Sequence, residues 1–188
     1  MLKLYGGKQT RASIVQWYLE ELGVPYEFIL LDMQQGEHRK SDFLAINPIG
    51  QVPAIVEGDF KLWESGAILL YLAEKYDRNV QSIEVRSQLN QWILFANATI
   101  APAIFIEANR EKAMPRTLTS LNEVLDDRHF LMGEEFTVAD IAAGSLLSYV
   151  PLVMDLDFAD YPHVTDYVRR IIERPAYQQT IGVAFSQS

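Results

Sequence analysis

The sequence predicts an α/β domain with the element order βαβαββα, followed by an all-α helical domain. Up to residue 76, short apolar runs typical of strands alternate with segments of helical periodicity. Residues 77–84, "DRNVQSIE", are polar and non-periodic, which is typical of a linker. Residues 85–188 show helical periodicity without convincing strand alternation. We therefore expect domains at residues 1–76 and 85–188, joined by the linker at 77–84.

Composition excludes several classes of function. The chain has 188 residues, of which 49% are hydrophobic, enough to bury a core. Its 25 acidic and 16 basic residues give a net charge of -9, which disfavours nucleic acid and anionic membrane surfaces as partners. No apolar run approaches the roughly 20 residues of a membrane span, and the N-terminal "MLKLYGGKQT" lacks a secretory pattern. We expect a cytoplasmic protein.

The absence of cysteine removes much of the usual site chemistry. Disulfides, cysteine nucleophiles and thiolate metal sites are excluded, so any thiol used here must arrive on a ligand. The three histidines, His38, His129 and His163, are scattered and lack the spacing of a metal motif. We therefore expect no metal cofactor.

The first elements form a βαβ unit. Residues 2–6, "LKLYG", alternate as a half-buried strand does. "RASIVQWYLEELG" has apolar residues at helical spacing, and Gly23 with Pro25 beyond it marks the end of the helix. "YEFILLD" reads as a second strand, so the crossover between the two strands should be right-handed.

A hairpin and a helix complete the first domain. After a short helical piece around "FLAI", "PAIVEGDFKLW" contains two strand runs separated by Gly58-Asp59, a hairpin signal. "ESGAILLYLAEKY" places Ile68, Leu72 and Tyr76 on one helical face, with Ser65 as the expected N-cap.

The second half predicts a helical bundle. A long helix over 86–107 should be interrupted at Pro102, and "TLTSLNEVLDD" predicts another helix after Pro115. Thr137 and Asp140 have capping-box spacing before a helix that is apolar nearly all round. Such a helix should run through the middle of the domain. "HVTDYVRRIIE", stopped by Pro175, is the last predicted helix.

The stretch "NPIGQVPAI" at 47–55 places a proline immediately before a short apolar strand. Proline gives no N–H to a sheet, so it is confined to the first residue of a strand, an edge or a bulge. An X-Pro bond is also the peptide bond that adopts the cis form at least cost. We predict a cis Val52–Pro53 turn.

Three segments in order resemble the cytosolic glutathione transferases: "GEHRKSDFLAINPIGQVPAI", "LWESGAILLYLAEKY" and "FTVADIAAG". "GEHRK" and "NPIGQVP" are most similar to the phi, theta and related bacterial branches. The resemblance covers essentially the whole chain. It implies a thioredoxin-like first domain, a helical-bundle second domain, glutathione as co-substrate, and a homodimeric transferase that acts in detoxification.

The resemblance also implies a glutathione site. Val52, before the cis Pro53, would pair its backbone with the cysteine of glutathione, as in strand addition. Ser65 and the helix end behind it would hold the γ-glutamyl carboxylate, because a helix N-terminus binds anions, while Glu64 would accept the ammonium. His38, Arg39 and Gln51 match the positions that bind the glycine carboxylate, with Lys40 as a possible helper.

The residue that activates the thiol is the open question. A thiol with a pKa of about 8.5 must be held as thiolate near neutral pH, so the site needs a hydrogen-bond donor or positive charge at the sulfur. Thr10 aligns best with the family's catalytic serine and is the predicted catalytic residue. Ser13, Arg11 acting electrostatically, and Tyr5 remain alternatives.

The connection "ANREKAMP" between two helices is shorter than is common in the family, which predicts a shallow, open acceptor site. That suits small electrophiles such as isothiocyanates as the second substrate. The competing interpretation is a non-catalytic, transferase-like binding module. Thr10 in place of serine keeps it open, whereas Arg39, Gln51, Glu64 and Ser65 argue against it.

Overall fold

The structure is a computed structural model that describes residues 1–77, 82–154 and 156–183, and the chain divides into two compact units. The first unit comprises Met1–Asn79 with Ala176–Ser188, and the second comprises Val80–Pro175. The sequence placed everything after residue 84 in one helical domain. The structure instead groups the C-terminal residues with the first unit, where the Tyr177 ring meets Trp17 edge-on at 5.2 Å between centroids.

A four-stranded mixed sheet forms the centre of the first unit. The strands are β1 (Leu2–Gly6), β2 (Tyr26–Leu30), β3 (Ala54–Glu57) and β4 (Phe60–Trp63), in the spatial order β2-β1-β3-β4. β1 pairs parallel with β2 and antiparallel with β3, and β3 pairs antiparallel with β4. The β3–β4 turn contains Gly58 at φ 60, as the hairpin signal predicted.

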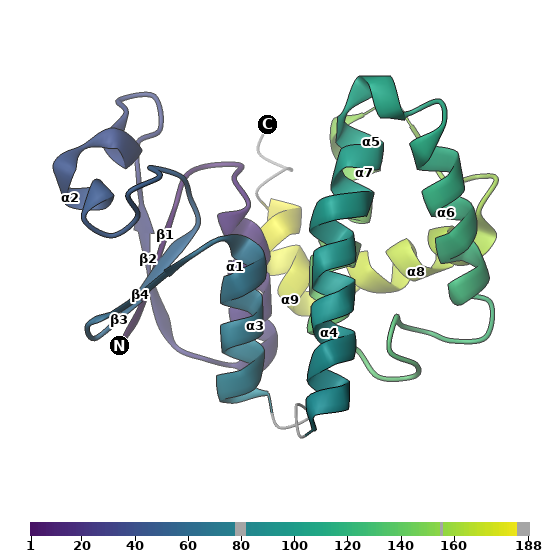
Figure 1. Cartoon of the computed structure of the whole chain (residues 1–188), viewed down its shortest axis with the longest axis horizontal. Coiled ribbons are helices and arrows are strands. Elements are labelled where there is room, and N and C mark those ends of the chain that lie inside the picture. Colours follow the sequence, from purple (N-terminus) through teal and green to yellow (C-terminus); the bar gives the residue numbers. More distant parts are fainter. Residues whose placement is uncertain (78–81, 155, 184–188) are drawn as a thin grey trace. The chain divides into compact units, whose positions relative to one another are not determined.

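Helices cover the sheet in the order that the sequence predicted. Figure 1 shows α1 (Ala12–Leu22) and α3 (Ser65–Tyr76) side by side against one face of the sheet. The single-turn α2 (Ser41–Leu44) follows the 3-10 turn η1 (Glu37–Arg39) on the other side of the strands. α1 ends at Gly23, whose left-handed backbone (φ 62) closes the helix. The βαβαββα order is confirmed.

The long helix of the second unit is interrupted earlier than predicted. α4 (Ile83–Phe95) begins inside the expected linker, whose residues 78–81 lie outside the described residues. A π-helical turn, η2 (Ala96–Ile100), then precedes α5 (Ala101–Phe105). Pro102 therefore lies just inside α5, and the departure from regular α-helix falls in the π-helical turn before it. A proline removes one N–H and crowds the carbonyl four residues back, so the distortion falls N-terminal to it.

The remaining helices are α6 (Ala113–Val124), α7 (Val138–Val153), α8 (Pro162–Ile172) and α9 (Pro175–Tyr177), with a 3-10 turn η3 (Glu107–Asn109) and a π turn η4 (Gln178–Gly182). Pro115 lies in the first turn of α6 instead of before it, where its missing N–H has no helical partner to lose. Pro175 opens α9 three residues after α8 ends, so it starts a short helix as well as bounding the previous one.

α7 runs through the second unit as predicted. Twelve of its residues are buried, and it packs against α4 and α8. Its N-terminus carries the predicted capping box: Thr137 caps the helix, and the Asp140 side chain accepts the Thr137 N–H at 2.8 Å. The Asp140 side chain also accepts the Leu131 N–H at 2.9 Å and the Tyr167 hydroxyl at 3.1 Å. One buried carboxylate therefore joins α7, α8 and the loop before α7.

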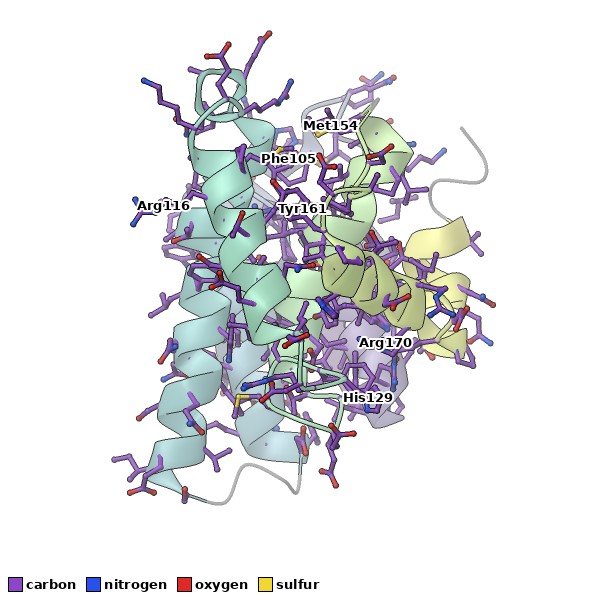
Figure 2. All side chains as sticks on the ribbon, turned by 90° about the vertical axis from the view of Figure 1, so that its right-hand side faces the viewer. Phe105, Arg116, His129, Met154, Tyr161 and Arg170 are labelled. Carbon is purple, nitrogen blue, oxygen red and sulfur yellow. The ribbon has the colours of Figure 1, made fainter. Side chains whose placement is uncertain are left out.

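Polar contacts connect the segment after α6 to α8. Figure 2 shows His129 and Arg170 close together, and the Arg170 Nε donates to the His129 carbonyl at 3.2 Å. The His163 Nε2 lies 3.1 Å from an Asp126 carboxylate oxygen. In residues 1–77, 82–154 and 156–183, the His, Asp and Glu side chains nowhere gather in a group that could hold a metal ion. Within those same ranges, every helix is too short or too polar to cross a membrane.

Candidate functional site

A cavity of about 260 Å³ opens in the first unit beside the start of β3 and the start of α3. It brings together five of the eight site residues predicted from the sequence: Gln51, Val52, Pro53, Glu64 and Ser65. Three further residues line it: Arg11, Asn47 and Trp63. Arg11 thus meets residues far from it in sequence because β1, which leads to Arg11, pairs directly with β3.

The Val52–Pro53 peptide bond is cis, as predicted. The β3 ladder starts at Ala54, opposite Tyr5, so Val52 lies just outside the sheet. Among the described residues, the N–H and C=O of Val52 pair with no protein group. A half-buried backbone with an unpaired donor and acceptor at a cavity is available to an extended ligand segment.

The Asn47 side chain fixes the backbone of the loop that leads to Val52. Its side chain is 1% exposed, donates to the Gln51 carbonyl at 2.7 Å and accepts the Ile49 N–H at 3.0 Å. Sequence reasoning did not single it out. The sequence does contain a signal for this role: Asn47 precedes Pro48, and asparagine often forms turns by hydrogen-bonding through its side chain to the backbone two residues later.

Replacing Asn47 with Ala is expected to lower the free energy of unfolding by about 2 kcal/mol, because the Gln51 carbonyl and the Ile49 N–H lose their buried partner. Asn47→Asp keeps the acceptor for the Ile49 N–H but removes the donor to the Gln51 carbonyl, so it isolates the contribution of the second hydrogen bond. Urea unfolding of the unaltered protein and of the two variants measures the free energy that each hydrogen bond contributes. Equal stability of Asn47→Ala and the unaltered protein would show that the loop is held by other contacts.

The N-terminus of α3 faces the same cavity. The N-cap is Glu64, with φ 73 and ψ 118, and Ser65 is the first helical residue. The prediction that Ser65 is the N-cap is therefore wrong by one position, because the chain needs the unusual Glu64 backbone to turn from β4 into the helix. No side chain caps α3. Within the described part of the chain, the Ser65 hydroxyl and the Glu64 carboxylate form no hydrogen bond or ion pair with another protein group.

This helix end has the properties of an anion site. The N–H groups of Ser65, Gly66 and Ala67 precede the first intrahelical bond, which runs from the Ile68 N–H to the Glu64 carbonyl. They carry the positive end of the helix dipole, about half an elementary charge. The Ser65 hydroxyl adds a further donor. A ligand carboxylate would be bound here, with the Glu64 carboxylate beside it for a cation.

The predicted residues His38, Arg39 and Lys40 are not among the residues that line this cavity. His38 and Arg39 belong to η1, and the Arg39 Nε donates to the His38 Nε2 at 3.2 Å. The His38 Nδ1 is buried without a partner in the described residues. η1 nevertheless touches the segment before Gln51, because a Cβ on Gly50 would lie 3.0 Å from the His38 carbonyl oxygen. Lys40 is exposed beside them.

The predicted catalytic residue, Thr10, lies in the loop between β1 and α1 and does not line the cavity. Its hydroxyl donates to the Gly7 carbonyl at 2.9 Å and is 3.3 Å from the Gly7 N–H and 3.4 Å from the Ala12 N–H. The Ser13 hydroxyl donates to the Thr10 carbonyl at 2.9 Å, and the Tyr5 ring lies 5.8 Å from the Phe43 ring. Of the four candidates, Arg11 alone is among the described residues that line the cavity.

Comparisons with known proteins identify the family of this chain. Residues 1–74 match the family model described as glutathione S-transferase, N-terminal domain, and residues 103–175 match glutathione S-transferase, C-terminal domain. The probable glutathione S-transferase GSTF2 of Oryza sativa subsp. japonica is 34% identical, over 97% of this chain and 96% of the relative. Glutathione S-transferase F9 of Arabidopsis thaliana is 30% identical, over 97% of each chain.

Solved structures with the same fold include transferases from a plant and a fungus. Glutathione transferase F7 from Populus trichocarpa superposes with a TM-score of 0.84 at 25% identity, covering 98% of this chain and 99% of its own. Glutathione transferase URE2P6 from Phanerochaete chrysosporium, solved in complex with oxidized glutathione, has a TM-score of 0.84 at 27% identity, covering 100% and 97%.

Proposed function

Because this chain belongs to the glutathione S-transferase family, we propose that it binds glutathione beside Val52 and joins the glutathione sulfur to small electrophiles such as isothiocyanates. One observation carries the proposal. A single cavity presents the unpaired Val52 backbone and the unpaired N-terminus of α3 with its neighbouring carboxylate. These groups complement the backbone of a cysteine and the carboxylate and ammonium of a γ-glutamyl group.

In the proposed pose, the cysteine of glutathione pairs its backbone with Val52, next to Pro53. The γ-glutamyl carboxylate accepts from the Ser65 hydroxyl and the first N–H groups of α3, and its ammonium pairs with Glu64. The glycine carboxylate would extend toward Gln51, His38 and Arg39, with Lys40 nearby. The contact between η1 and Gly50 supports this last step, since it keeps His38 and Arg39 close to Gln51.

The proposed reaction starts from the ionised thiol. With an isothiocyanate, the thiolate sulfur forms a bond to the central carbon of the N=C=S group, and one C–N π pair moves to nitrogen. Nitrogen then takes up a proton equivalent to the one lost by the thiol, which leaves a dithiocarbamate with atoms and charge balanced. The protein contributes by holding the two reactants together and keeping the sulfur ionised. Thr10 stays the sequence-based prediction for the second task.

The short connection between α5 and α6, which contains only η3, supports small acceptors. A turnover panel tests this: glutathione with benzyl isothiocyanate, an aryl halide and a bulky steroid-like electrophile. We expect the highest kcat/KM with the isothiocyanate and measurable turnover with the aryl halide. Strict preference for the bulky acceptor would contradict an open site, and no turnover with any acceptor would favour the non-catalytic binding module.

We also propose that two copies associate and that the protein acts in detoxification in the cytoplasm, as the family resemblance implies. Sedimentation velocity at micromolar concentration tests the first point. A single species at twice the chain mass of 21.4 kDa is expected, and a monomer would contradict the proposed dimer.

Glu64→Gly is expected to change stability and binding in opposite directions. A non-glycine residue at φ 73 is strained by about 1–3 kcal/mol, so glycine should raise the free energy of unfolding by about 1 kcal/mol after its greater unfolded-state entropy is counted. Glutathione affinity should fall by about tenfold or more, because the ligand ammonium loses its carboxylate. Glu64→Gln, which keeps the strain, is the matched control. Unchanged affinity in both variants would remove Glu64 from the site.

A further inference from the structure

We infer that Trp63 is a further glutathione-binding residue, whose indole ring covers the γ-glutamyl group of the bound molecule. This inference rests on the proposed function, since it concerns the glutathione bound between Val52 and the N-terminus of α3. Nothing in the sequence pattern distinguishes Trp63 from the other two tryptophans, Trp17 and Trp92. The observations that do so come from the structure.

The first argument is the position of Trp63 in the chain. It is the last residue of β4, directly before Glu64 and Ser65, and all three residues line the same cavity. Figure 1 shows that β4 leads directly into α3. Across the ladder, Trp63 pairs with Ala54, the first residue of β3. A ligand that reaches from Val52 to the start of α3 therefore passes beside Trp63.

The second argument is the face of the sheet on which the indole lies. Alternate residues of a strand point to the same face, so Trp63 shares a face with Lys61. The Lys61 Nζ donates to the Ala45 carbonyl at 2.9 Å, directly after α2. The indole therefore lies on the α2 side of the sheet, where Asn47 and Gln51 also line the cavity.

The third argument is that the indole has no partner in the described parts of the chain. Trp63 is 36% exposed, and within those parts its N–H forms no hydrogen bond and its ring contacts no other aromatic ring. Trp17, in contrast, is 0% exposed, and its Nε1 donates to the Glu21 carboxylate at 2.9 Å. Phe60, also exposed on β4, packs on the Tyr71 ring with 4.8 Å between centroids. An aromatic surface left open in the wall of a cavity is typical of a ligand contact.

The γ-glutamyl group has the chemistry that such a residue binds. Its charged head carries a carboxylate and an ammonium, and methylene groups join this head to the rest of the peptide. With the head held by Ser65 and Glu64, the methylene groups lie over the indole, which removes apolar surface of both from water. The ammonium beside Glu64 is also attracted to the face of the ring. Trp63 therefore favours thiol peptides that carry a γ-glutamyl group, whichever residue follows the cysteine.

Calorimetric titration with glutathione and with γ-glutamylcysteine tests this contact, because the second ligand keeps the γ-glutamyl group and lacks the glycine. In Trp63→Ala we expect the affinity for both ligands to fall about tenfold, and in Trp63→Phe about threefold or less. Phe60→Leu removes an exposed aromatic ring from the same strand at a position that does not line the cavity, so both affinities should stay unchanged. Urea unfolding checks that each variant is folded.

Tryptophan fluorescence gives an independent readout of the same contact. Glutathione should change the emission of the unaltered protein, and Trp63→Phe should abolish that change. Trp92→Phe makes the same exchange in α4 of the second unit and should retain it. A change of emission that persists in Trp63→Phe would contradict a contact between the ligand and this indole.

The paired ligands separate the other outcomes. Unchanged affinities in Trp63→Ala would overturn the inference, and a loss confined to glutathione would overturn it in favour of a contact with the glycine. Binding of glutathione without binding of γ-glutamylcysteine to the unaltered protein would show that the γ-glutamyl end is not the part that is recognised. Absence of glutathione binding to the unaltered protein would instead refute the proposed function.

Discussion

Asp140→Ala is expected to lower the free energy of unfolding by about 4 kcal/mol. The Asp140 side chain is 0% exposed and accepts from four donors: the N–H groups of Leu131 and Thr137 and the hydroxyls of Thr137 and Tyr167. Alanine leaves the Leu131 N–H and the Tyr167 hydroxyl buried without a partner, at about 1–3 kcal/mol each, and also removes the capping box of α7. Because α7 is the central helix of the second unit, its loss of support should unfold the unit as a whole.

Urea unfolding followed by circular dichroism measures the loss, and Thr137→Ala is the control. That variant removes only the cap hydroxyl, so we expect a cost of about 1 kcal/mol. A similar cost for both substitutions would show that the contacts of Asp140 with Leu131 and Tyr167 contribute little, which would contradict the account of how α7 is held.

The same residue should make stability depend on pH. Burial raises the pKa of Asp140 to about 6, although its hydrogen bonds act in the opposite direction. Since the folded pKa lies above the unfolded value of about 3.9, the folded state holds the proton more tightly. This contribution is fully present below about pH 4 and is lost as the pH rises through 6, a change of at most about 3 kcal/mol. Asp140→Asn, which does not titrate, should lack this component in unfolding measured from pH 4 to 7.5.

Ser65→Asp is expected to abolish glutathione binding while leaving the fold intact. A carboxylate at the first position of α3 would occupy the N–H groups that we assign to the γ-glutamyl carboxylate and would repel that group. We expect affinity to fall at least about 100-fold. The same substitution should leave stability unchanged or raise it by about 0.5 kcal/mol, because an acidic residue in the first turn favours a helix.

Ser65→Asn is the matched control for Ser65→Asp, since it has the same shape without the charge. We expect a loss of affinity of about tenfold or less, from the missing hydroxyl alone. Equal losses in the two variants would point to steric blockage of the cavity. Undiminished binding in Ser65→Asp would show that the ligand carboxylate is bound elsewhere.

The sequence predicted the features that depend on local pattern. The order βαβαββα follows from periodicity that changes between strand and helix, and the capping box follows from the spacing of Thr137 and Asp140. The cis bond at Pro53 was predictable from the stretch "NPIGQVPAI" because few arrangements tolerate a proline at the edge of a strand. Each of these depends on residues close to one another in the chain.

The features that were missed depend on backbone geometry or on partners far away. Ser65 was expected to be the N-cap of α3, and the positive φ of Glu64, which moves the cap back by one residue, has no sequence pattern of its own. Pro102 was expected to break a helix, whereas the π turn η2 accommodates it one turn earlier. Arg11 was among the sequence-based alternatives to Thr10, but its place in the lining of the cavity depends on the pairing of β1 with β3, which joins segments far apart in the chain.

The most direct test of the central claim is calorimetric titration of glutathione into the unaltered protein at pH 7, in two buffers of different ionisation enthalpy. The account predicts saturable binding of one glutathione per chain, with a buffer-dependent heat that reports release of the thiol proton, and the loss of both in Ser65→Asp. Binding without proton release would retain the site and remove thiolate stabilisation from it. No saturable heat at millimolar glutathione would contradict the assignment of the cavity beside Val52 as a glutathione site.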